Sequence, residues 1–233
     1  MVKRITVLLL LIGIGAIFAA LLLGYTPDSE LNYTARYYAD NTVKDTGAAN
    51  IVAAIVVTYR GLDTLGEVTV LFLAAAIVGL VLASSSHPQG RMRRDRPASG
   101  ELLVIGARLL VPLIMLLGVY VFVNGHLTPG GGFQGGAILA SGALLMLLGD
   151  PLKKFSHRLI SMVESLSGLV FVGMGLLGFL YAGGFLDNRV LPLGTLGDLL
   201  SAGAIPIIYS FVGLKVGAEF SSMLVNLSGT EEL

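Results

Sequence analysis

Long apolar segments recur along the chain and are separated by short polar stretches. Six of them stand out, near residues 5–24, 64–84, 101–124, 133–149, 161–184 and 200–226. An α-helix needs about 20 residues to cross the hydrocarbon core of a bilayer, and most of these segments reach that length. The pattern therefore predicts an all-α fold, a polytopic integral membrane protein with about six transmembrane helices.

Two apolar segments need a closer reading. The run from Ile5 to Gly24 is longer than the apolar core of a signal peptide, which is usually about 7–15 residues, and no clear A-x-A cleavage site follows it. We therefore expect a retained span there. The stretch 46–83 is too long for one span and is interrupted near residues 60–67. It predicts a short interfacial or re-entrant helix over about 47–59 and then a full span.

Basic residues gather at residues 3–4, 91–96 and 153–158. Loops on the cytoplasmic side carry an excess of Lys and Arg. All three groups fall on that side if the segment 47–59 does not cross the membrane and the six other segments do. The chain is thus predicted to be a multi-pass protein of the plasma membrane with both termini in the cytoplasm.

Composition narrows the classes of function. Hydrophobic residues make up 55% of the chain and charged residues only 13%, against about 25% in a typical soluble domain, so lipid is the expected surrounding. The net charge of zero argues against a nucleic-acid surface. Because the chain has no cysteine, it offers no ligands for iron–sulfur clusters or thiolate metal sites, and no cofactor or metal is expected in it. An enzyme acting on lipid would need converging acid–base groups, for which only His126 is a candidate.

The glycine-rich stretch "GHLTPGGGFQGGA" covers residues 125–137. Its "GGGFQG" fits G-x-G-x-x-G, but the strand that a dinucleotide site requires before it is missing. Two interpretations stay open: a tight turn into the next helix, or polar groups along an ion or water path, since irregular backbone at membrane depth is buried or lines water. The motif residues are Thr128, Pro129, Gly130, Gly131, Gly132, Gln134, Gly135 and Gly136.

Charged residues inside the predicted spans are the candidates for function. Lys215 and Glu219 lie four residues apart in the last span and so share one helix face. An unpaired charge at mid-membrane costs roughly 2.5–3.5 kcal/mol on insertion scales. The pair therefore either fixes the rotation of the helix or belongs to a proton or cation relay. Arg60, Asp63 and Glu67 lie at the start of the second span, where headgroups solvating them are the alternative to a role in transport.

Small residues recur at four-residue spacing in two spans, as Gly136 and Ala140 and as Gly213, Gly217 and Ser221. Such rows let transmembrane helices approach one another closely. We expect them at helix contacts within the chain or with partner subunits.

At these residues a family resemblance becomes visible. "GHLTPGGGFQGGAILASGALLM" and the later "GLKVGAEFSSM" closely resemble the B subunit of Mrp-type multisubunit Na+/H+ antiporters, the MnhB family, over about 101–226. "NIVAAIVVTYRGLDTLGEVTVLFLAAAIVGLVL" resembles the E subunit of archaeal membrane-bound hydrogenase. The resemblance implies a membrane domain like the hydrogenase E subunit at 1–90, a basic cytoplasmic linker at 91–100, and a B-type domain of four helices at 101–233.

What the resemblance implies is a non-catalytic membrane subunit of an Mrp-type module, which couples ion translocation to redox chemistry in an archaeal respiratory complex. Its partners would be antiporter-like large subunits, small C-, E-, F- and G-type subunits, and a peripheral iron–sulfur oxidoreductase arm. The order of an E-type before a B-type domain favours a hydrogenase or sulfane-sulfur reductase complex over a plain antiporter. The ion-translocation candidates are Lys215, Glu219, Glu67, Asp63, Arg60 and His126.

A stand-alone secondary transporter is the alternative from another class. It predicts an inverted repeat with broken helices in matching positions. The two halves 1–90 and 101–226 show no such repeat.

Overall fold

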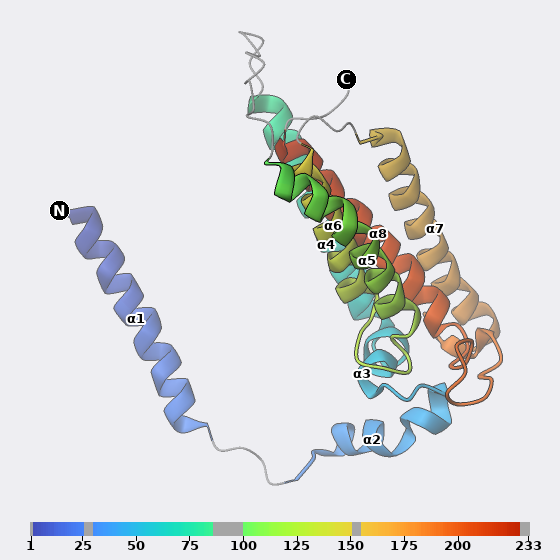
Figure 1. Cartoon of the computed structure of the whole chain (residues 1–233). Coiled ribbons are helices and arrows are strands. Elements are labelled where there is room, and N and C mark those ends of the chain that lie inside the picture. Colours follow the sequence, from blue (N-terminus) through green and yellow to red (C-terminus); the bar gives the residue numbers. More distant parts are fainter. Residues whose placement is uncertain (1, 26–29, 86–99, 151–154, 229–233) are drawn as a thin grey trace. The chain divides into compact units, whose positions relative to one another are not determined.

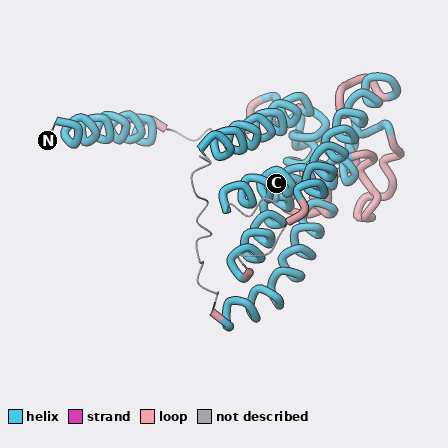
Figure 2. Tube along the Cα trace, turned by 90° about the horizontal axis from the view of Figure 1, so that it is seen from above, coloured by secondary structure: helices cyan, strands magenta, loops and turns pink. Residues whose placement is uncertain are grey.

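The computed structural model describes residues 2–25, 30–85, 100–150 and 155–228, and every regular element among them is a helix (Figures 1 and 2). The chain forms two compact units, Met1–Tyr37 and Tyr38–Leu233. Most of the predicted linker 91–100 and the lysines of 153–158 lie outside the described residues. The predicted domain division and orientation therefore stay predictions.

The first unit contains α1 (Val2–Gly24) and the start of α2 (Tyr33–Thr46). α1 is apolar throughout and long enough to cross a membrane. The side chain of Asn32 accepts a hydrogen bond from the Ala35 amide at 2.8 Å, which caps the first turn of α2.

The second unit holds the rest of the fold. After α2 its elements are α3 (Ile51–Ala54), the π-helical turn η1 (Ile55–Tyr59), α4 (Gly61–Ser85), α5 (Glu101–Val123), α6 (Gly132–Gly149), α7 (His157–Tyr181), the 3₁₀ turn η2 (Asn188–Val190) and α8 (Ile205–Ser228). With α1, the five helices α4 to α8 make six helices of membrane-spanning length in the described part of the chain. The prediction of about six transmembrane helices is thus confirmed.

The segment 47–59 does not form a span of its own. α3 and η1 together contain nine residues, which at about 1.5 Å per residue is too short to cross about 30 Å of hydrocarbon. Ala53, Ala54 and Val57 are fully buried, in one cluster with Ile205 and Ile208 of α8. This segment is therefore a short helical insertion enclosed by protein, as the re-entrant alternative predicted.

α8 (red in Figure 1) is the central helix of the second unit. It packs against α4, α5, α6 and α7, while α5 and α6 also pack on each other. Glycines bring the backbones together: a Cβ on Gly136 of α6 would lie 2.7 Å from the Gly213 carbonyl oxygen of α8. On α6 as well, a Cβ on Gly135 would lie 2.7 Å from the Gly118 carbonyl oxygen of α5. The predicted small-residue contact thus lies inside the chain, between α6 and α8.

Three segments meet at one end of the bundle, at the lower edge in Figure 1, and we call residues 46–60, 124–131 and 182–204 the loop end. Asn50 fastens the first two of these segments together. Its side-chain amide donates to the carbonyl oxygens of Gly125 (2.8 Å) and Thr128 (3.0 Å), and its backbone amide donates to the carbonyl oxygen of His126 (3.0 Å). Its Oδ1 meanwhile caps α3.

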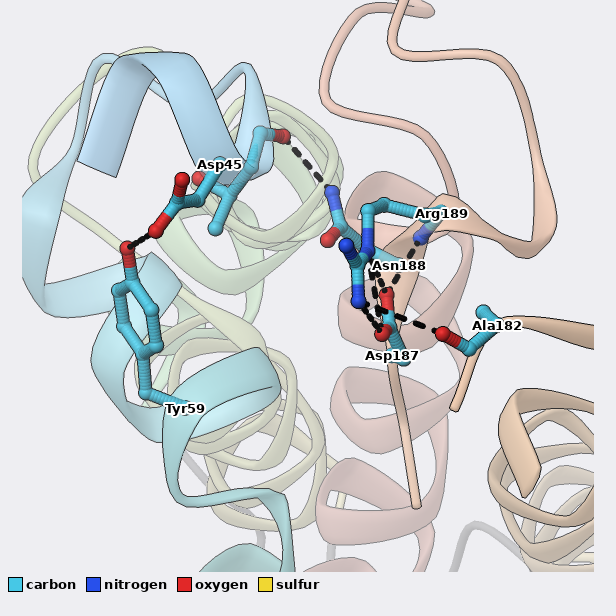
Figure 3. Close-up of polar contacts among 7 residues, drawn as sticks. Asp45, Tyr59, Ala182, Asp187, Asn188 and Arg189 are labelled. Atoms are coloured by element: carbon cyan, nitrogen blue, oxygen red, sulfur yellow. Dashed lines mark hydrogen bonds and ion pairs between the residues drawn. The ribbon is translucent and has the colours of Figure 1, made fainter. Parts of the chain in front are cut away.

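Asn188 fastens the third segment in the same way. Its buried side-chain amide donates to the carbonyl oxygens of Thr46 (2.7 Å) and Ala202 (2.9 Å) (Figure 3). Beside it, Arg189 Nε donates to Asp187 Oδ1 at 2.9 Å. Although burial raises the pKa of Asp187, the hydrogen bonds and charge of Arg189 outweigh it and hold that pKa below the usual range. Two buried asparagines thus connect segments that are far apart in sequence.

His126 is fully buried within the loop end, and its Nε2 donates to the Asp198 carbonyl oxygen at 3.4 Å. Burial lowers the pKa of His126 by more than its hydrogen bonds to the backbone of Asp198 and Val123 raise it. The folded loop end therefore favours the neutral imidazole.

The close contact of α6 and α8 predicts a cost for any side chain at Gly136. Gly136→Ala forces the two backbones apart, and overpacking of this kind typically costs about 1–3 kcal/mol. We expect a lower midpoint of thermal unfolding in detergent. Gly106→Ala on α5 is the matched control, because no atom lies within 4 Å of its added Cβ. Equal midpoints for the two variants would contradict this packing.

The lowered pKa of His126 predicts a pH dependence of stability. The unfolded imidazole binds a proton more readily than the folded one, so stability is present above the ordinary pKa of about 6.5 and falls on acidification below it. We expect the unfolding midpoint to fall more between about pH 7.5 and pH 5.5 in the wild type than in His126→Gln. His157→Gln, at an exposed histidine, should retain the wild-type dependence. An unchanged pH dependence in His126→Gln would refute the assignment.

Candidate ion-translocation site

The Lys215–Glu219 pair lies within α8. Lys215 Nζ and Glu219 Oε1 are 2.7 Å apart, and the two side chains are 11% and 0% exposed. Lys215 follows the start of α8 by ten residues, about 15 Å along a helix whose 24 residues span about 36 Å. The structure therefore places a buried ion pair near the middle of a membrane-spanning helix.

Neighbouring helices on two sides shape the position of Lys215. The ring of Phe72, on α4, has its centroid 5.1 Å from Nζ, within the range of a cation–π contact. On α7, Gly168 faces the lysine stem: a Cβ there would be 3.6 Å from Cδ and 3.7 Å from Nζ. The ammonium thus lies where surfaces of α4 and α7 meet α8.

The carboxylate of Glu219 is only partly satisfied. Oε1 pairs with Lys215, but Oε2 is buried and has no hydrogen-bond partner among the described residues. Glu164, on α7, is near enough for its charge to act on Glu219. Two carboxylates thus accompany one ammonium, and one buried oxygen can still accept a proton or a hydrogen bond.

Glu164 was not among the residues predicted from the sequence. A single carboxylate near the start of a span resembles one that reaches toward headgroups, and it forms no pattern with other charges. The one available signal was its spacing to Gly168, one turn further along the same face of α7.

The charges at the start of α4 do not join this pair. Arg60 and Asp63 form an ion pair with side chains 61% and 51% exposed, as expected of a cluster at the membrane interface. Glu67 is exposed, and helix geometry places it about 140° around α4 from Phe72, the residue that touches Lys215. A role of these three residues in ion transfer stays a prediction.

The polar groups of the glycine motif belong to the turn between α5 and α6. Thr128 Oγ1 donates to the Asn124 carbonyl oxygen at 3.2 Å, and Gln134 is exposed, with its Oε1 close to Gly131. Gly130 and Gly131 have φ of 158° and 154°, conformations that favour glycine. These contacts are those of a tight turn, and a role of His126 in ion transfer stays a prediction.

Known proteins resemble the chain over nearly its whole length. A chain of the membrane-bound sulfane sulfur reductase, an archaeal respiratory membrane complex, is 40% identical, with a TM-score of 0.81 over 97% of this chain and 98% of that one. A chain of the Mrp complex from Dietzia sp. DQ12-45-1b is 30% identical, with a TM-score of 0.78, over 99% of this chain but 26% of that one. An uncharacterised protein of Methanocaldococcus jannaschii is 31% identical over 204 residues, 77% of each chain.

The match to the Mrp complex corrects one expectation. Both domains align within a single longer chain of that complex, so the order of an E-type before a B-type domain also occurs in an Mrp complex. Domain order alone therefore does not separate a hydrogenase or sulfane-sulfur reductase complex from a plain antiporter.

Two family models divide the chain between them. The model of the MBH protein's E-type component matches residues 2–104. The model of a domain related to the MnhB subunit of Na+/H+ antiporters matches residues 102–222, more than half of the chain. The last span with its Lys215–Glu219 pair and the glycine-rich turn both lie within the second match. The chain belongs to the family of MnhB-related domains of Na+/H+ antiporters.

Proposed function

We propose that the chain is a non-catalytic membrane subunit of an Mrp-type antiporter module within a respiratory complex, and that its Lys215–Glu219 pair takes part in ion transfer. The buried pair at mid-span is the observation that carries the second part. A charged side chain inside a membrane span is expensive and by default marks an ion or proton pathway. The family and the two structural neighbours support the first part.

The geometry gives the pair two states. With Glu219 ionised, Lys215 is neutralised at 2.7 Å. A proton arriving at Glu219 removes that partner and leaves the ammonium without a counter-charge on its own helix. Glu164 is then the acidic group on the neighbouring helix to which Lys215 can turn, past the open surface at Gly168. Proton binding to Glu219 and movement of Lys215 are thereby coupled.

The partners follow from the same proposal. Antiporter-like large subunits and small C-, E-, F- and G-type subunits would surround the chain in the plasma membrane, with both termini in the cytoplasm. Redox chemistry would take place in a peripheral iron–sulfur arm on other subunits, since this chain has no cysteine to hold a cluster. Large apolar side chains such as Leu116 on α5 and Leu180 on α7 are exposed, as surfaces against lipid or other membrane subunits require.

The second candidate is a subunit of a plain Mrp antiporter, which the 30% identity to the Mrp complex favours. The 40% identity over almost the full length of both chains favours the sulfane sulfur reductase type. We expect iron–sulfur oxidoreductase subunits to co-purify with this chain when it is isolated from its native membrane in mild detergent. Recovery of antiporter subunits alone would support the second candidate instead.

Variants of the pair test its role in transport. Removing a positioned proton-transfer group typically costs about 100-fold or more, so Lys215→Ala and Glu219→Gln should each reduce ion transport by the complex on that order. The complex should still assemble. Glu30→Gln with Arg36→Ala removes an exposed ion pair and serves as the matched control, with transport unchanged.

Two outcomes would overturn this role. Normal transport and normal assembly in both variants would show that the pair is dispensable. Loss of assembly alone, with normal transport per assembled complex, would show that the pair only fixes the rotation of α8.

A further inference from the structure

α8 carries a row of four polar side chains from mid-span to its C-terminal end. Lys215, Glu219, Ser222 and Asn226 are spaced by four, three and four residues, so they share one helix face. We call these four residues the polar row. α4 borders the row at two heights, with Phe72 beside Lys215, and with Gly79, where a Cβ would lie 3.5 Å from Asn226 Nδ2.

The same face of α8 is apolar in the other direction. Above Lys215, towards the loop end, it presents Ile208, Phe211 and Val212. Ile208 and Val212 are each 1% exposed and belong to the main apolar cluster of the bundle. Polar groups therefore lead from the ion pair towards only one end of the bundle.

Two atoms of the polar row are buried acceptors that receive no hydrogen bond. They are Glu219 Oε2 and Asn226 Oδ1, and neither has a partner in the part of the chain that the structure describes. Buried acceptors of this kind in native proteins are usually satisfied by protein groups or by ordered water. A water needs two to four polar partners, and the row supplies them in succession: a carboxylate, a hydroxyl and an amide.

We propose that the polar row is a hydrated half-path that connects the Lys215–Glu219 pair with the aqueous phase at the end of the bundle where α8 ends. Water molecules donate to Glu219 Oε2 and Asn226 Oδ1 and bridge past Ser222. Protons reach Glu219 along them, while the apolar residues beyond Lys215 keep the path closed towards the loop end. The use of this path for protons rests on the proposed function; its hydration does not.

The natural lack of cysteine makes a direct test available. Ser222→Cys is introduced into the complete complex in membrane vesicles, and a membrane-impermeant thiol reagent is added from either face. A thiol reacts as the thiolate, which forms in water and not in dry apolar packing. We expect Ser222→Cys to react from the face at which α8 ends. Asn226→Cys, one turn further along the row, should react from the same face and gives a second measurement.

Val225→Cys is the matched control. Val225 is on the same helix, 1% exposed, and nearer the C-terminal end of α8 than Ser222. If depth alone governed reactivity, Val225→Cys would react faster; if the polar row is hydrated, Ser222→Cys should react about tenfold faster or more. Equal rates, faster labelling of Val225→Cys, or labelling of Ser222→Cys only from the opposite face would overturn the proposal.

The result separates this proposal from the proposed function. An unreactive Ser222→Cys, combined with loss of transport in Lys215→Ala, would overturn the hydrated path and leave the role of the pair intact. A reactive Ser222→Cys with normal transport in Lys215→Ala and Glu219→Gln would support the path and remove the role of the pair.

Discussion

Enclosing the Lys215–Glu219 pair in the middle of an apolar bundle is the constraint on which the arrangement of helices depends. Each charge is tolerated at that depth only with a partner and with protein around it. α8 supplies both charges, α4 and α7 border the ammonium through Phe72 and Gly168, and α6 covers another side. α6 comes close enough because Gly136 lets its backbone rest on Gly213 of α8. The central helix and the charge pair are thus parts of one solution to the same problem.

The two ends of the bundle differ in a way that fits this solution. At the loop end, Asn50 and Asn188 tie segments from both family matches together and satisfy backbone carbonyls that would otherwise be buried without donors. At the other end, acceptors on Glu219 and Asn226 are left for water. One end is therefore closed by protein hydrogen bonds, and the opposite end offers the polar groups that a path to water needs.

The sequence predicted the parts of this structure that depend on local pattern. Apolar length was enough for the six helices, and the spacing of Lys215 and Glu219 was enough for their shared face. It could not reveal Asn188, whose amide reaches a carbonyl 142 residues away, or Glu164, which matters only because α7 packs on α8. It also gave Glu67 and Lys215 equal standing as charges inside spans. Only packing shows that Glu67 is exposed on α4 while the pair is enclosed.

A change in the protonation of Glu219 during transport is the central claim, and infrared difference spectroscopy of the intact complex measures it directly. When an ion gradient is imposed across the membrane, a protonated-carboxyl band should appear in the wild-type complex and be missing in Glu219→Gln. A difference spectrum identical in the two complexes would contradict the account, because Glu219 would then keep one protonation state while ions move.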